Sequence, residues 1–190
     1  MHALVVSLFV VAVAEIGDKT QLLSLVLAAR FRRPVPILVG IAAATLANHA
    51  IAGALGAWLR SILQPQVLRW ALVASFLALA VWALRADRLD DEASNRHARF
   101  GPFVVSLVAF FLVEIGDKTQ IATVALGARF PELHWVVVGT TLGMLAANVP
   151  VVFVGAAAAD RLPLRWIRLA AAILFAAMAG LAAFGGGLEL

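Results

Sequence analysis

The heptapeptide EIGDKTQ stands at residues 15–21 and returns unchanged at residues 114–120. Each copy lies inside a long apolar run. A charged side chain at the centre of a membrane costs about 2.5–3.5 kcal/mol on insertion scales, which a single Leu or Val at about −0.5 kcal/mol does not offset. Because this cost is incurred twice, the two heptapeptides are the first candidates for a functional site.

The composition of the chain is that of an integral membrane protein. Of its 190 residues, 63% are hydrophobic and 14% are charged, whereas soluble domains carry roughly 25% charged residues. The mean hydropathy is +0.98. At about 20 residues per span, the apolar runs predict an all-α protein with six transmembrane helices. The six runs cover residues 3–28, 35–59, 67–84, 102–128, 134–159 and 164–184.

The arginines indicate the orientation in the membrane. Ten lie in or beside the links after runs one, three and five, against three in or beside the other links. By the positive-inside rule these links are expected in the cytoplasm and both termini outside. The net charge of +4 therefore reports topology, and no nucleic-acid partner is expected. The ten arginines are Arg30, Arg32, Arg33, Arg85, Arg88, Arg96, Arg99, Arg161, Arg165 and Arg168.

The repeat extends well beyond the heptapeptide. At the same offset of 99 residues, Ala29-Arg30-Phe31 matches Ala128-Arg129-Phe130, and Gly40 matches Gly139. The chain therefore divides into a three-helix repeat at 1–84, a solvated connecting loop at 85–99 and a second repeat at 100–190. Since each repeat has an odd number of spans, the second is expected to insert inverted, as in many secondary transporters, with binding sites near the midplane.

Within each heptapeptide, a continuous helix would gather the charges on one face. Glu15 and Asp18 would share that face, with Lys19 close to it, while Thr20 would be turned away. Gly17 would let another backbone or an ion come close. Antiparallel docking of runs one and four would then bring four carboxylates together, and either a divalent cation or protons could neutralise them. These carboxylates are Glu15, Asp18, Glu114 and Asp117.

Several neighbouring residues are candidates for supporting roles. Lys19 and Lys118 would either offset the negative charge when the metal leaves or make simple i, i+4 ion pairs. Ser24 and Thr123 are expected to serve helix packing, and His49 to have a structural or tuning role. The candidate neutral oxygen ligands, for which helix-to-helix hydrogen bonding is an alternative, are Asn48, Asn148, Gln21 and Gln120, and the close-approach glycines are Gly17 and Gly116.

The ligand set favours hard cations. All candidate ligand atoms are oxygens, and the chain has no cysteine, so thiolate metal sites and disulfides are excluded. Carboxylate and carbonyl oxygens suit Mn²⁺, Ca²⁺ or Mg²⁺ better than Zn²⁺ or Cu⁺. A removable signal peptide is not expected, because the first run lacks a basic leader and contains charges.

At these residues the sequence resembles the cation exchangers of Golgi, chloroplast and bacterial membranes, whose hallmark is a twice-occurring Glu-x-Gly-Asp-(Lys/Arg)-(Thr/Ser). The hallmark reads EIGDKT at 15–20 and at 114–119. The resemblance covers essentially the whole chain and implies transport of Mn²⁺, often with Ca²⁺, in exchange for protons, without a resident cofactor. It is closest in form to bacterial manganese exporters, which implies the bacterial inner membrane, and it assigns metal binding to the four carboxylates.

Other functions remain open on the residues alone. Four midplane acids could form the selectivity site of a divalent-cation channel or uniporter, and each Glu–Lys set could be a buried ion pair in a non-transporting scaffold. Enzymes are not expected. An intramembrane aspartyl protease uses Gly-x-Gly-Asp, but Glu15 and Glu114 stand where the first glycine is needed. A P-loop is excluded because no glycine directly precedes the lysine.

Overall fold

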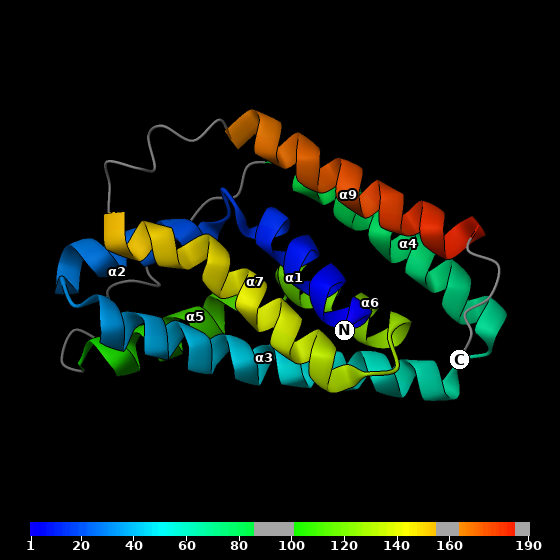
Figure 1. Ribbon diagram of the computed structural model, residues 1–190, viewed down its shortest axis with the longest axis horizontal. Coiled ribbons are helices and arrows are strands. Elements are labelled where there is room, and N and C mark those ends of the chain that lie inside the picture. The colour runs from blue at the N-terminus through cyan, green and yellow to red at the C-terminus, as the bar shows by residue number, and fades with distance from the viewer. Residues whose placement is uncertain (86–100, 155–163, 185–190) are drawn as a thin grey trace.

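The computed structural model describes residues 1–85, 101–154 and 164–184. The predicted connecting loop falls almost wholly outside these ranges, as do the last five residues of the fifth apolar run. The regular structure of the described ranges is helical (Figure 1). The helices are α1 His2–Glu15, α2 Lys19–Phe31, α3 Pro34–Ile62, α4 Pro65–Ala83, α5 Pro102–Glu114, α6 Lys118–Arg129, α7 Leu133–Val154 and α9 Leu164–Phe184.

Four of the predicted apolar runs coincide with single helices. Runs two, three and six become α3, α4 and α9, and run five begins with α7. Prolines open α3, α4 and α5, where the missing N–H has no helical partner to lose. By length and composition, three helices of the described chain can cross a membrane: α3, α4 and residues 133–153 of α7.

The prediction of continuous helices through the two heptapeptides is wrong. The first run is divided between α1 and α2, and the fourth between α5 and α6. Gly17 and Gly116 have φ values of 81° and 75°, in the left-handed region that glycine adopts without steric cost. The next residues, Asp18 and Asp117, occupy the N-cap positions of α2 and α6. A glycine therefore ends one helix, and an aspartate starts the next.

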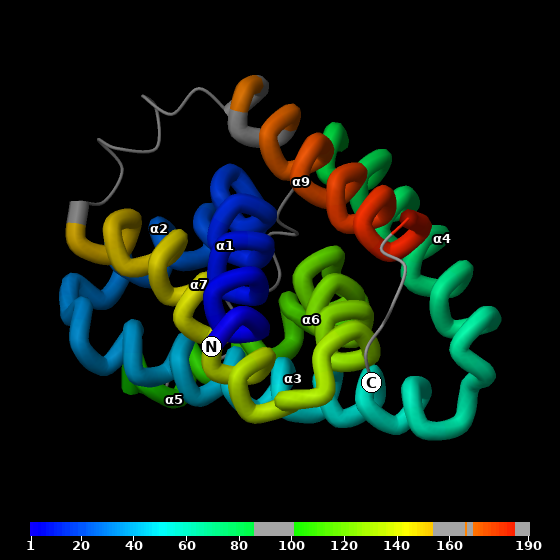
Figure 2. The backbone as a smooth tube through the Cα atoms, turned by 45° about the vertical axis from the view of Figure 1, so that its right-hand side comes forward, coloured from blue at the N-terminus to red at the C-terminus, as the bar shows by residue number. Residues whose placement is uncertain are grey.

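The two repeats pack reciprocally. α1 packs against α7 as α5 packs against α3, and α2 contacts α7 as α6 contacts α3. The remaining equivalent helices pair with each other, α3 with α7 and α4 with α9. Figure 1 shows that α3 and α7 run in opposite directions, as do α4 and α9, and Figure 2 shows the same pairings from another side. Each repeat thus completes its packing with helices of the other.

Glycines allow the closest of these contacts. A Cβ added at Gly139 would lie 2.5 Å from the Leu4 carbonyl oxygen of α1, and one at Gly40 would lie 2.7 Å from the Phe103 carbonyl oxygen of α5. Small residues favour such contacts in membrane helices because van der Waals packing drives their association. Backbone therefore rests almost directly on backbone along both pairs.

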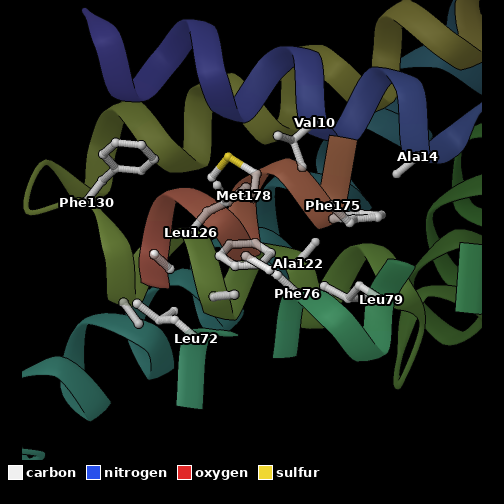
Figure 3. Close-up of a cluster of buried hydrophobic side chains, with 14 of the residues drawn as sticks. Val10, Ala14, Leu72, Phe76, Leu79, Ala122, Leu126, Phe130, Phe175 and Met178 are labelled. Atoms are coloured by element: carbon white, nitrogen blue, oxygen red, sulfur yellow. The ribbon is translucent and has the colours of Figure 1, made fainter. Parts of the chain in front are cut away.

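One apolar cluster connects helices of both repeats. Figure 3 shows Val10 of α1, Phe76 of α4, Leu126 of α6 and Phe175 of α9 around a common centre, and all four side chains are at most 1% exposed. A second cluster packs α2, α3 and α5 together and includes Phe110. Between them, the two clusters include side chains from all four helices that flank the breaks.

Candidate cation site at the two helix breaks

The acidic side chains of both heptapeptides are buried at the helix breaks. Glu15 and Glu114 end α1 and α5, and Asp18 and Asp117 start α2 and α6. Each is at most 1% exposed. The helix is interrupted between the glutamate and the aspartate of each copy. Both carboxylates of a copy are therefore buried although they do not lie on one continuous helix.

Three of the four carboxylates gather at one point. Glu15, Asp18 and Asp117 each offer an oxygen within 4.8 Å of the other two. Oxygen ligands stand about 2.0–2.6 Å from Mg²⁺ or Ca²⁺, so ligands around one ion are at most roughly 4–5 Å apart. The three oxygens therefore have the spacing that one divalent cation needs. They come from both repeats, as docking of the two heptapeptides requires.

Glu114 lies outside this group of three because α3 holds its carboxylate. Its two oxygens accept hydrogen bonds from the Thr45 hydroxyl at 2.8 Å and the Asn48 amide at 3.0 Å. The Asn48 amide also donates to the carbonyl oxygen of Phe111 at 3.1 Å. The Asn48 amide nitrogen thus binds an acid of the site, and ligation by its amide oxygen stays a prediction.

Glu15 has different partners. Its carboxylate accepts hydrogen bonds from the hydroxyls of Thr20 and Thr119, one from each heptapeptide. The expectation that Thr20 turns away is therefore wrong. It assumed an unbroken helix, whereas the left-handed Gly17 interrupts the helix before Thr20.

The two lysines cross between the repeats. The Lys19 ammonium lies 3.0 Å from the Asp117 carboxylate, and the Lys118 ammonium lies 3.3 Å from the Asp18 carboxylate. Both of these ion pairs join one copy to the other, whereas i, i+4 pairing would join residues of the same copy. The Lys118 side chain is 4% exposed and that of Lys19 is 23% exposed. Each lysine therefore offsets charge on the opposite copy.

The glutamines stabilise the breaks. The amide oxygens of Gln21 and Gln120 accept hydrogen bonds from the backbone N–H groups of Gly17 and Gly116, each at 2.8 Å. Both amide oxygens are hydrogen-bonded to the backbone, and this role competes with the predicted ligation of a metal ion. A Cβ at Gly116 would meet no described atom within 4 Å, so this glycine is required by its φ and not by a close approach of another backbone.

The remaining sequence candidates lie outside the carboxylate group. The Asn148 amide oxygen accepts a hydrogen bond from Ser24 at 2.6 Å, and its nitrogen donates to the Met144 carbonyl at 3.0 Å. Thr123 donates to the Thr119 carbonyl within α6, consistent with helix packing. His49 is 1% exposed, and neither ring nitrogen has a hydrogen-bond partner among the described residues.

Sequence reasoning missed the threonines. Thr20 and Thr119 recur inside the repeated heptapeptide, and this recurrence was the available signal. Thr45 stands three residues before Asn48, which places the two on one face of α3. The pair thus forms a small polar patch on a largely apolar helix.

Buried acids and lysines where several apolar helices meet are typical of ion-transport proteins in membranes. The chain matches the family model described as "Divalent cation/proton antiporter GDT1" over residues 3–91 and 102–188. It belongs to that family, and it is a membrane transporter of divalent cations rather than an enzyme.

Two relatives cover nearly the whole chain. A Vibrio cholerae protein named "Putative manganese exporter" is 56% identical over 185 residues, which are 97% of this chain and 92% of the relative. A GDT1-like protein of Synechocystis is 30% identical over 196 residues, covering 92% of this chain and 93% of that protein. No solved structure matches the chain.

Proposed function

We propose that this protein exports Mn²⁺ in exchange for protons, with Ca²⁺ as a second substrate, and that Glu15, Asp18 and Asp117 bind the ion. The observation that carries this proposal is the group of three buried carboxylates with oxygens within 4.8 Å of one another. The name of the Vibrio relative supports Mn²⁺ as the principal cation, and the oxygen ligands suit it.

The balance of charges in the site supports exchange with protons. Four carboxylates and two lysines lie in the two heptapeptides, so the fully ionised group carries a net charge of −2. In a medium of low dielectric this charge requires neutralisation. One divalent cation or two protons provide it, and we therefore infer an exchange of one ion for two protons.

Glu114 is the fourth member of the proposed mechanism. Its bonds to Thr45 and Asn48 keep it beside the ion group, where it accepts a proton or joins the ligands as the repeats move. The crossed lysines would separate from the aspartates when the ion binds and return to them when it leaves. The lysines would thus compete with the cation for the aspartate oxygens, while protons restore the charge balance of the site after the ion leaves.

We place the protein in a bacterial inner membrane as six spans in two inverted repeats. In this arrangement, α1 with α2 and α5 with α6 each make one broken span, and both termini lie outside. Broken helices near the midplane are common at the ion sites of secondary transporters. Reciprocal packing of the two repeats supports this plan. The ion then enters from the cytoplasm, and protons entering from outside displace it.

The test is flux in proteoliposomes that contain the purified protein and a lumenal pH dye. Mn²⁺ and Ca²⁺ are supplied separately to the wild type, Asp117→Asn and Glu132→Gln. Glu132 is exposed and lies outside the ion group, so Glu132→Gln is the matched control for replacing an acid with an amide.

The proposal predicts Mn²⁺ movement with opposite proton movement in the wild type and the control, and loss of both in Asp117→Asn. Mn²⁺ flux without proton movement would instead identify a channel or uniporter. Normal exchange in Asp117→Asn would rule out the carboxylate group as the binding site.

A further inference from the structure

Two serines occupy equivalent places in the two repeats and have an unusual environment. Ser7 lies in α1 and Ser106 in α5, separated by the repeat offset of 99 residues. Both are 0% exposed. Neither hydroxyl has a hydrogen-bond partner among the described residues, although a buried polar group without a partner costs free energy.

Each serine lies where its helix touches a glycine of the other repeat. The Ser7 Cβ is 2.9 Å from the position that a Cβ on Gly139 would occupy, and the Ser106 Cβ is 2.8 Å from that position on Gly40. We call these contacts the α1–α7 seam and the α3–α5 seam. Both are closed here, and alanine would fill either position equally well, so the closed state gives no reason for a hydroxyl.

Both serines lie on the helices that end at the ion group. Each stands eight residues before the glutamate that ends its helix, a distance of about 12 Å along the axis. One turn after each serine, Val11 or Phe110 fills the intervening position, and both side chains are 0% exposed. A hydroxyl, an apolar plug and an acid therefore follow one another on successive turns of both helices.

The two rows of serine, apolar side chain and glutamate, one on α1 and one on α5, lead to the ion group from opposite sides. α1 and α5 run in opposite directions (Figure 1), so Ser7 and Ser106 lie on opposite sides of the helix breaks. Hydroxyl oxygens are suitable contacts for a hard, hydrated cation. When a seam opens, its serine would face water and no longer be without a partner.

We propose that Ser7 and Ser106 are pathway hydroxyls, one on each side of the carboxylate group, which a hydrated divalent cation contacts as the α1–α7 and α3–α5 seams open in turn. This inference rests on the proposed transport function and adds the path by which the ion reaches the carboxylate group. Ser7 belongs to the outer entrance and Ser106 to the cytoplasmic entrance.

The chain has no cysteine, so Ser7→Cys and Ser106→Cys introduce single thiols of nearly the same size. Intact cells and inside-out vesicles are treated with a charged, membrane-impermeant methanethiosulfonate, with and without Mn²⁺. We expect each thiol to react at least tenfold faster from one side, with opposite sides for the two positions, and Mn²⁺ to change both rates. Ala179→Cys, buried in the α4–α9 pair at 3% exposure, is the control and should stay unlabelled.

Labelling of both positions from the same side, or of neither in variants that still transport, would overturn the proposal. A second pair of variants, Ser7→Ala and Ser106→Ala, retains the closed packing. We expect Mn²⁺ binding to the purified protein to change by less than twofold and transport to fall about tenfold, since removing a hydrogen-bonding group from a water-filled path weakens a transient contact. Unchanged transport in both would also overturn it.

Labelling is separable from the proposed function. If the wild type moved no Mn²⁺ while the two thiols still reacted from opposite sides, the export proposal would fail and the alternating seams would stand.

Discussion

The two copies of EIGDKTQ have the same letters and different surroundings. Glu15 accepts hydrogen bonds from a threonine of each copy and lies with both aspartates. Glu114 is held by Thr45 and Asn48 of α3. The repeat places Met144 where the first half has Thr45, so α7 offers no matching hydroxyl at that position. Identical motifs interrupt the helix at the same place, but the neighbouring helix decides which partners each glutamate has.

The largest expected effect comes from the aspartates, each of which pairs with the lysine of the other copy. Asp18→Asn and Asp117→Asn each remove a charged ligand from a buried site and leave a lysine without its ion-pair partner. A loss of about 3 kcal/mol corresponds to roughly a 100-fold fall in Mn²⁺ transport, measured as initial flux in proteoliposomes. Equal losses are expected, and a large difference between the two would break the symmetry of the aspartates.

The glutamates should separate the two copies. Glu15→Gln replaces one of three clustered ligands, and we expect Mn²⁺ affinity to fall roughly tenfold or more, since a charged contact contributes about 1.5–3 kcal/mol. Glu114→Gln keeps the acceptor for Thr45 and should change affinity by less than about threefold, while transport falls in both. The measurement is Mn²⁺ titration of the purified proteins, and equal losses of affinity would contradict the asymmetric site.

The lysines offer a comparison of stability. Lys118→Met leaves Asp18 with one fewer counter-charge at a buried position, which costs roughly 3–5 kcal/mol when a buried pair is broken. Lys19 is more exposed, so Lys19→Met should cost only about 1 kcal/mol. Thermal unfolding in detergent measures both.

A double variant provides the control for the buried lysine. Lys118→Met with Asp18→Asn should recover part of the lost stability, because removing both partners leaves no buried unpaired charge. Further loss in the double variant would show that the crossed pair is not the cause.

How far the sequence predicts this molecule depends on the residue considered. The apolar runs predict α3, α4 and α9 because continuous hydrophobicity is a local signal. The breaks at Gly17 and Gly116 were not predicted, since a lone glycine in an apolar run is also compatible with a continuous helix. Asp18-Lys19-Thr20-Gln21 has the Asp-x-x-Gln spacing of a helix start, and this signal could have located them.

The acids of the site could be predicted from the sequence, but the residues that contact each acid could not. The repeated heptapeptide and the free-energy cost of a charge in the membrane are enough to identify the four acids from the sequence. These are Glu15, Asp18, Glu114 and Asp117. Which lysine pairs with which aspartate, and which glutamate joins the group, depends on contacts between residues about 100 positions apart. Such long-range choices follow from packing of α3 and α7, which the local pattern does not encode.

Modest effects on stability are expected at the glycines of the breaks. Gly17→Ala and Gly116→Ala force an L-residue into positive φ, at a cost of about 1–2 kcal/mol in unfolding free energy. Asn tolerates this region better, so Gly116→Asn should cost less than Gly116→Ala. Thermal unfolding of the three variants checks the order, and an alanine variant as stable as the wild type would argue against the left-handed turn.

The most direct test of the central claim is the ratio of protons to Mn²⁺ moved, measured together in proteoliposomes with the membrane potential clamped. Two carboxylate charges remain after the lysines are counted, so the account predicts two protons per ion and a rate independent of the potential. A flux of Mn²⁺ that moves no protons and follows the potential would contradict it.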